Sequence, residues 1–451
     1  MRIIWCFLCL LFCSANAFGQ TVLWDMVEDV SGGLNVMRAI TLSTRSAVFI
    51  GNADNSAADV HDFVIQSLRR KTGSVRWTDR VQESPGLLTS LQIASFQGRV
   101  FASGYTTGPG NGTDIVVRGY DAFHGTLLWN SVWDAGRDDL PQAIVAGPTA
   151  VIVVGYGGNS PGHALNFIVR AYDPIDGAIL WEDRVERTDL STAAWAVAIT
   201  RTRVFVAGNT ISQTNARDLL LRVYTVASGA LLWETTRPST SPTEIKASGG
   251  RVFLAGSSSD HSFVGVWSAK SGALLWEDDS TDPGIFLDIS VKGDRVVAAG
   301  SSKSTVLVRA YDVEDGRLEW QDQTTCGESD RATGVALNER AVYVVGSCSQ
   351  DFVYSEILVR SYAANDGTML WEDRSHRTSS GFTSGSSAVD VALGRNRLFV
   401  AGSETEERSL GVGPVQEFVV RAYDIQADGL ACSSETPPIS QSSPGFCVAV
   451  P

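Results

Sequence analysis

Three carboxylates recur at one position of an internal repeat and are the main candidates for chemistry in this sequence. Glu244, Asp288 and Asp390 each precede an Ile or Val in a short apolar segment, and Gln92 stands at the same position of an earlier copy. Clustered carboxylates repel one another, so their pKa values rise or they recruit a counter-ion, and oxygen ligands suit Ca²⁺ better than Zn²⁺. Lys246 could instead neutralise Glu244. Two interpretations therefore stay open, a cation or polar-ligand site and a hydrated channel mouth.

The histidines and cysteines disfavour several other chemistries. Five histidines occur without an HxH or HExxH pattern, and the sequence contains no GxSxG or P-loop motif. No CxxC or CxxCH motif occurs, so a zinc knuckle, a thioredoxin-like site and covalent haem lack their signatures. Four cysteines follow the N-terminal segment, and an even number in an exported chain indicates disulfides. We expect the pairs Cys326–Cys348 and Cys432–Cys447.

The N-terminal segment predicts export to the periplasm or the extracellular space. In residues 1–17, Arg2 precedes an apolar run that ends at Phe12, and Ala15-Asn16-Ala17 matches a signal-peptidase site. A lipoprotein signal ending at Cys13 is the rival interpretation, but Phe12 stands where that signal needs a small residue. No later stretch has eighteen consecutive apolar residues, so we expect no transmembrane segment.

The composition favours β structure and disfavours nucleic-acid binding. The 451 residues include 43 glycines and only 4 methionines, and the formal net charge is −14. Binding to nucleic acid requires a basic face, which an acidic chain does not predict. The apolar fraction of 44% is ample for a folded core. We expect a monomer.

Two alternating motifs predict an all-β fold of eight units. One is a strand, a glycine turn and a strand that ends in Trp, as in VRAYDPIDGAILW at 169–181; the other is an apolar strand followed by Gly, as in RVFVAG at 203–208. Each unit of about 50 residues would contain four strands. The last copy has Cys432 where the others have Trp, but TVLW at 21–24 could supply that missing strand. We therefore predict an eight-bladed β-propeller with four-stranded antiparallel blades, closed by the N-terminal strand.

The repeat resembles the PQQ-type β-propeller repeat, whose pattern is roughly Ala-x-Asp-x-x-Thr-Gly-x-x-x-Trp. Ala171, Asp173, Gly177 and Trp181 match it, with Asp176 in place of Thr. The resemblance implies a propeller over 18–431, followed by a Ser/Pro-rich tail at 432–451. It also implies that the recurrent tryptophans dock each blade against its neighbour. These residues are Trp24, Trp77, Trp129, Trp181, Trp233, Trp276, Trp320 and Trp371.

Two functions follow from this architecture. The expected loops between the second and third strands are long in several units but short near 257–262 and 301–304, which predicts an uneven loop-rich face with a notch. Such a face suits a non-catalytic binding or scaffold module for a protein or other envelope component, with no cofactor. The alternative is a quinoprotein-like oxidoreductase with PQQ and a cation, such as calcium, at the channel mouth. The resemblance would then imply an adjacent Cys-Cys pair, which this sequence lacks.

Overall fold

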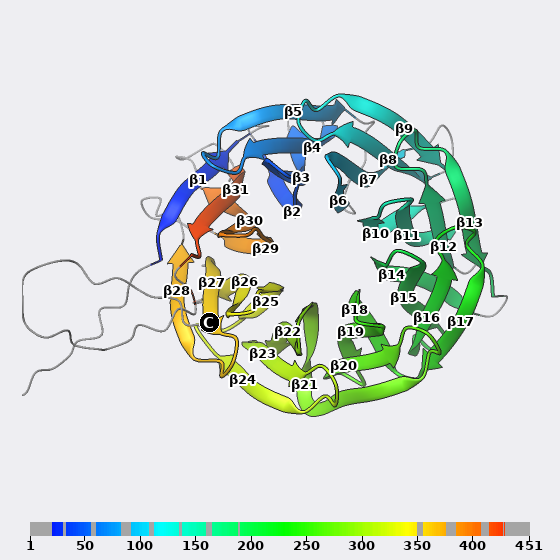
Figure 1. Cartoon of the computed structure of the whole chain (residues 1–451). Coiled ribbons are helices and arrows are strands. Elements are labelled where there is room, and N and C mark those ends of the chain that lie inside the picture. Colours follow the sequence, from blue (N-terminus) through cyan, green and yellow to red (C-terminus); the bar gives the residue numbers. More distant parts are fainter. Residues whose placement is uncertain are drawn as a thin grey trace, which may run out of the picture.

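Eight four-stranded antiparallel blades form a ring in the computed structural model (Figure 1). The structure describes residues 20–29, 33–55, 60–82, 92–107, 112–134, 138–158, 165–187, 190–349, 355–375, 385–406, 415–426 and 428. The predicted signal segment and the C-terminal tail lie outside these residues. All the regular elements in the described ranges are β-strands.

The first four blades follow one another along the chain, each running from the ring axis outwards. Blade 1 contains β2 (Asn35–Leu42), β3 (Ser46–Asn55), β4 (Val60–Arg69) and β5 (Val75–Gln82). Blade 2 contains β6 (Gln92–Phe96), β7 (Arg99–Thr107), β8 (Thr113–Asp121) and β9 (Leu127–Trp133). Blade 3 contains β10 (Leu140–Ala146), β11 (Val151–Gly158), β12 (Leu165–Tyr172) and β13 (Ile179–Val185). Blade 4 contains β14 (Ser191–Ile199), β15 (Arg203–Ile211), β16 (Arg217–Thr225) and β17 (Leu231–Arg237).

The last four blades complete the ring. Blade 5 contains β18 (Thr240–Ser248), β19 (Arg251–Ser258), β20 (His261–Ser268) and the first part of β21 (Leu274–Lys292). Blade 6 contains the second part of β21, β22 (Arg295–Ser302), β23 (Thr305–Asp312) and β24 (Leu318–Thr324). Blade 7 contains β25 (Arg331–Leu337), β26 (Ala341–Ser349), β27 (Ser355–Ala363) and β28 (Met369–Ser375). Blade 8 contains β29 (Ser386–Leu393), β30 (Arg397–Glu406), β31 (Val415–Asp424) and β1 (Val22–Glu28).

One strand belongs to two blades. β21 pairs with β20 through its first part and with β22 through its second part, so blades 5 and 6 form a continuous seven-stranded sheet. The other six blades are separate four-stranded sheets. The eight predicted blades are therefore confirmed, although hydrogen-bond continuity merges two of them.

The N-terminal strand closes the ring as the sequence predicts. β1 pairs antiparallel with β31, with Trp24 opposite Ala422 and Asp25 opposite Arg421. Figure 1 shows the blue first strand beside the red last strand. Joining both ends of the chain in one sheet leaves no open end in the ring of blades.

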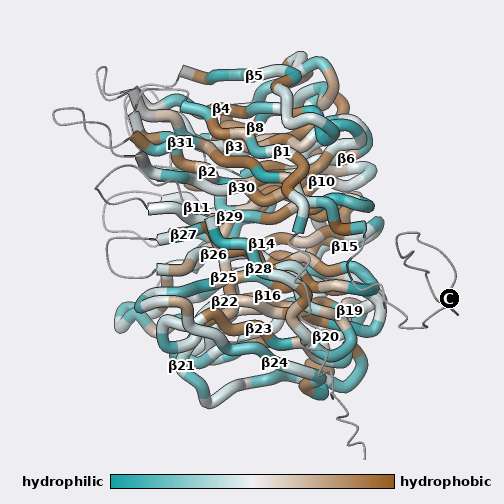
Figure 2. Tube along the Cα trace, turned by 90° about the vertical axis from the view of Figure 1, so that its left-hand side faces the viewer, coloured by the Kyte–Doolittle hydropathy of each residue, from teal (hydrophilic) through white to brown (hydrophobic). Residues whose placement is uncertain are grey.

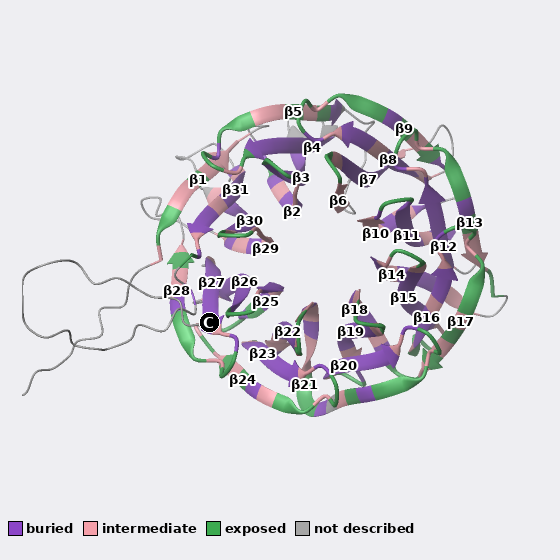
Figure 3. Ribbon diagram, viewed as in Figure 1, coloured by how far each residue is buried: buried purple, intermediate pink, exposed green. Residues whose placement is uncertain are grey.

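The apolar core lies between the blades. Strands such as β15 are buried along almost their whole length because each blade is covered on both faces. Ile152 and Val154 of β11, for example, pack in one cluster with Val204 and Val206 of β15. Figure 2 shows hydrophobic bands within the strands, and Figure 3 shows exposure concentrated on the outermost strands.

The two ends of the disc differ. The turns between the first and second strands lie beside the turns between the third and fourth, as the hydrogen bond from Ala269 N to Gly250 O shows (2.9 Å). The other two kinds of connection meet at the opposite end, where Ser259 N donates to Ser239 O (2.8 Å). We call these ends the turn face and the loop face.

Candidate functional site

A β-bulge places the candidate carboxylates on the innermost strands. The register shifts between Phe286 and Asp288 in β21 and between Ala388 and Asp390 in β29, and β18 has the same shift just before Glu244. A bulge redirects the side chain that follows it. The recurrent position seen in the sequence is therefore the first residue after a recurrent bulge.

Asp288 and Asp390 each join two neighbouring blades. Asp390 accepts hydrogen bonds from Val391 N (2.7 Å) in its own strand and from Ile40 N (2.9 Å) in blade 1. Asp288 likewise accepts from Ile289 N (2.7 Å) and from Val335 N (2.8 Å) in blade 7. Both oxygens of each carboxylate therefore accept backbone donors.

Two threonines make the corresponding bonds at the alternate seams. Thr243 donates to Phe286 O (2.7 Å), which links blades 5 and 6, and Thr333 donates to Ala388 O (2.9 Å), which links blades 7 and 8. From blade 5 round to blade 1, hydroxyl and carboxylate bonds thus alternate along the inner wall. These bonds give Asp288 and Asp390 a structural role that the sequence analysis missed.

The third candidate forms an ion pair near the axis. Lys246 Nζ lies 2.8 Å from Glu244 Oε1, and 44% of the lysine side chain remains exposed. Burial tends to lower the pKa of Lys246, but Glu244, Asp288 and Asp390 together hold it above its usual value. The structure therefore brings the three predicted carboxylates into one electrostatic cluster around this ammonium group.

The two aspartates have raised pKa values. Burial raises the pKa of Asp390 to about 7, and the charge of Asp288 acts in the same direction. Burial raises the pKa of Asp288 to about 6, although Lys246 opposes the shift.

The fourth candidate from the sequence, Gln92, lies apart from these carboxylates. It begins β6 opposite Ser103, in blade 2, two blades away from Asp390.

The axial residues do not fit a calcium or quinone site. Among the described residues, the sets of three or more metal-ligating groups within 4.8 Å are Asp114–Asp134–Asp139 and Cys326–Asp330–Cys348, and the axial carboxylates form no such set. The oxygens of Asp288 and Asp390 already accept N–H donors.

The eight recurrent tryptophans lie at the seams. The Trp129 indole covers Gly177 of the next blade so closely that a Cβ there would lie 2.6 Å from the ring, and Gly177 has a φ of 74°. Only glycine tolerates both conditions. Each indole N–H also donates across its seam, from 2.7 Å for Trp181 to Val226 O up to 3.4 Å for Trp129 to Pro174 O. The other donors are Trp24, Trp77, Trp233, Trp276, Trp320 and Trp371.

An Asp–Tyr–Arg group reinforces five of the seams. Asp183, two residues after Trp181, accepts from Tyr224 Oη (2.7 Å) and Arg222 Nη1 (2.5 Å) of the next blade. Asp79, Asp278, Asp322 and Asp373 hold equivalent partners. The Trp-x-Asp spacing recurs in the sequence, but its partners lie in the neighbouring blade and are far away along the chain.

The structure joins Cys326 and Cys348 in a disulfide on the loop face of blade 7. The buried Asp330 holds the backbone around this disulfide in place. Its carboxylate accepts hydrogen bonds from Cys326 N (2.5 Å), Gly327 N (2.9 Å) and Ser349 N (2.9 Å). Cys432 and Cys447 lie outside the described residues, so their pairing stays a prediction. A second group, formed by Asp114, Asp134 and Asp139 near the loop face, was not anticipated from the sequence.

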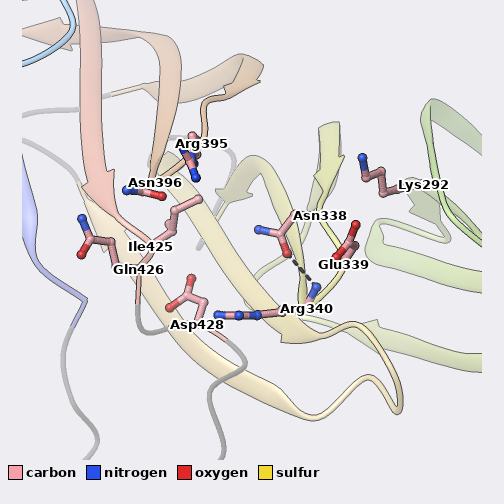
Figure 4. A pocket seen from close by; sticks show the side chains of 9 residues that line it. All are labelled: Lys292, Asn338, Glu339, Arg340, Arg395, Asn396, Ile425, Gln426 and Asp428. Carbon is pink, nitrogen blue, oxygen red and sulfur yellow. Dashed lines mark hydrogen bonds between the residues drawn. The ribbon is translucent and has the colours of Figure 1, made fainter. Parts of the chain in front are cut away.

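Two neighbouring cavities on the turn face share part of their lining. The first, of about 600 Å³, is formed by turns of blades 6, 7 and 8 (Figure 4). Its polar lining includes Lys292, Arg340, Arg395 and Asp428, and Arg340 N donates to Asn338 Oδ1 (2.8 Å). The second, of about 480 Å³, lies between blades 8 and 1 and shares Arg395 and Asn396 with the first. The lining of the second cavity comes from turns and from strand ends beside them, including Arg69 of β4, Arg76 of β5 and Arg397 of β30.

A family model described as "Outer membrane protein assembly factor BamB" matches residues 21–255 and 216–357, which together span most of the ring. The chain belongs to this family. The match agrees with the PQQ-type repeat recognised in the sequence. A search of curated proteins found no match.

Several solved structures have the same fold. The quinohemoprotein alcohol dehydrogenase from Comamonas testosteroni has a TM-score of 0.59 and 12% identity, covering 95% of this chain and 79% of that one. BamB from Moraxella catarrhalis has a TM-score of 0.51 and 14% identity, covering 90% and 98%. The computationally designed Ika8 protein has a TM-score of 0.56 and 15% identity, covering 90% and 100%. At these identities the likeness shows the fold alone. Within the described ranges, no helix has the length and apolar character needed to cross a membrane.

Proposed function

We propose that this protein is an exported, non-catalytic binding or scaffold module whose partner is another protein, bound at the loop face. Family membership supports this function, because the family model is named for an assembly factor. The structural role of Asp288 and Asp390 favours it over catalysis at the axis, since their oxygens accept backbone donors.

The observation that carries the proposal is the uneven height of the loop face. In blades 5 and 6 the second and third strands are joined by two-residue turns, Ser259–Asp260 and Lys303–Ser304, and all four residues have positive φ. In blades 1 and 8 the equivalent strands are 10 residues long instead of 8. A low sector across the ring from a high one gives the rigid ring a shaped surface, which suits recognition of a protein.

Site-specific photocrosslinking tests the proposed surface. A crosslinking residue at Asp260 or Lys303 should give the same partner band in an extract of the native cell envelope. A matched position at Asp176, in a turn on the opposite face, should not give that band. An identical pattern from all three positions would refute binding at the loop face.

Two further measurements separate this function from its alternative. N-terminal sequencing of the exported protein should begin at Phe18, and retention of the full segment would refute the export prediction. An absorbance titration with PQQ tests the oxidoreductase alternative. Saturable quinone binding that is lost in Asp288→Ala/Asp390→Ala would replace the scaffold function with that alternative.

A further inference from the structure

The cavity between blades 8 and 1 is lined almost entirely by cations. Apart from Thr44 and Asn396, its lining consists of six arginines and one lysine, with no carboxylate: Arg45, Arg69, Arg70, Lys71, Arg76, Arg395 and Arg397. The chain as a whole has 36 basic and 50 acidic side chains. The ring closure therefore gathers a fifth of the basic residues around one hollow of about 480 Å³ in an acidic protein.

These charges are not neutralised by neighbouring acids. None of the seven forms a salt bridge with a carboxylate within the described part of the chain, although most other seams contain Arg–Asp or Arg–Glu pairs. Burial, followed by the charges of Arg69 and Arg45, lowers the pKa of Arg76. Burial and then Arg397 lower the pKa of Arg70 in the same way. The cations therefore repel one another, and a bound anion would relieve that repulsion.

An equivalent seam shows what a purely structural arrangement looks like. Between blades 5 and 6, Trp276 covers Gly316 and Arg251 pairs with Glu314, two residues before that glycine. Between blades 8 and 1, Trp24 covers Gly73, and the two equivalent positions hold Arg397 and Lys71. The position that holds Glu314 at the seam between blades 5 and 6 thus holds a second cation at this seam.

The turn that carries Lys71 has a cation at a second position, where several other blades have an acid. At its first position blades 2, 3, 6 and 8 have an aspartate, such as Asp173, which accepts from Ile175 N of its own turn (2.7 Å). Blade 1 has Arg69 there. Blade 1 therefore has a cation at a position where four other blades have a carboxylate that supports the turn.

The arginines are held in place by their surroundings. Arg397 Nη1 donates to Arg70 O, Arg70 N donates to Arg45 O (3.3 Å), and Arg70 Nη1 donates to Ser43 O (3.4 Å). Arg76 and Arg45 stack on the Phe123 ring at 4.2 and 5.8 Å from its centroid. Cations fixed by hydrogen bonds and aromatic contacts are pre-organised for a ligand.

We propose that this cavity binds a compact ligand that carries two or more phosphate groups. Guanidinium groups match the oxygen geometry of phosphate with paired hydrogen bonds. A phosphate group brings about −1.5 to −2 charges, so two or three of them balance most of the cluster within a hollow of this size, which single carboxylates would not do. The site lies on the turn face, so it is independent of protein binding at the loop face.

Calorimetry with inorganic tripolyphosphate tests the proposal on the whole protein at low salt. Wild type should bind saturably, and its affinity should fall as salt rises. Lys71→Glu should weaken binding at least tenfold, because it would create at this seam the ion pair that Arg251 and Glu314 form elsewhere, and it should keep the melting temperature. Lys270→Glu is the matched control, since Lys270 occupies the same turn position in blade 5, outside this cavity. It should change the affinity less than twofold.

The outcomes distinguish the source and the class of the ligand. Sedimentation of wild type, but not Lys71→Glu, with phosphatidylcholine vesicles that contain cardiolipin would indicate a lipid headgroup. Binding of tripolyphosphate without vesicle binding would indicate a soluble phosphorylated compound. The proposal fails if wild type shows no saturable binding, if Lys71→Glu and Lys270→Glu lose affinity equally, or if hexaglutamate binds more tightly than tripolyphosphate.

Discussion

Asp390→Asn should change how the stability of the ring depends on pH. The carboxylate accepts Ile40 N of blade 1 and Val391 N of its own strand, and burial raises its pKa to about 7 from a reference value of 3.8. The folded protein therefore holds this proton at pH values where the unfolded chain has lost it. Consequently, stability falls as pH rises from about 4 to about 7 and the contribution then levels off.

The size of the effect follows from the two pKa values. Between pH 5 and pH 8, a shift from 3.8 to about 7 corresponds to a loss of roughly 2.6 kcal/mol in wild type. We expect about 2 kcal/mol, since Asp390 is partly exposed and part of its pKa shift depends on the charge of Asp288. Asp390→Asn has no titrating group at this position, so it lacks this pH-dependent loss of stability. Its amide can accept only one of the two N–H groups, however, which costs about 1–3 kcal/mol at every pH.

The assay is urea unfolding at pH 5, 6, 7 and 8, followed by tryptophan fluorescence. Asp390→Asn should be less stable than wild type at pH 5, and the difference should shrink by about 2 kcal/mol by pH 8. Asp366→Asn is the control, because this exposed turn aspartate has a lowered pKa and should not titrate in that range. Parallel curves for wild type and Asp390→Asn would show that the raised pKa, and the burial behind it, are wrong.

Three further predictions concern closure, disulfides and calcium. Trp24→Ala should destabilise the ring by about 2–3 kcal/mol in thermal and urea unfolding, because the half-buried indole covers Gly73 and donates to Arg70 O; a loss no larger than that of Val22→Ala would mean that β1 does not close the ring. Peptide mapping without reduction should recover Cys326–Cys348 and Cys432–Cys447, and free thiols or crossed pairs would contradict this assignment. Calcium calorimetry should give no binding that depends on Asp288 and Asp390, because the axial carboxylates already have protein partners; saturable binding that Asp288→Ala/Asp390→Ala abolishes would restore the cation interpretation.

The repeat made the fold predictable, but not the roles of its residues. The turn glycines and the strand tryptophans recur at a regular spacing, so blade number and closure followed from the sequence. The same spacing identified Asp288 and Asp390 as unusual. Their bonding could not be foreseen, because it depends on a bulge and on the register of the next blade, neither of which is written in the local sequence.

The cation-lined cavity was hidden for a related reason. Its residues come from segments near 45, 70 and 395, and only pairing of β1 with β31 brings the last of these segments beside the first two. Each segment alone is an ordinary polar turn. The available signal was the run Arg69-Arg70-Lys71, because no other copy of the repeat has three consecutive cations at these positions.

The unbroken path of β21 gives the ring a stiff side. Because this strand pairs first in blade 5 and then in blade 6 without an intervening loop, amide exchange in the two blades should be coupled. The first and last strands, β1 and β31, pair nearly opposite, in blade 8 (Figure 1). If β1 detaches, the ring should therefore open at blade 8. Blades 5 and 6, on the opposite side, should stay joined because they share β21.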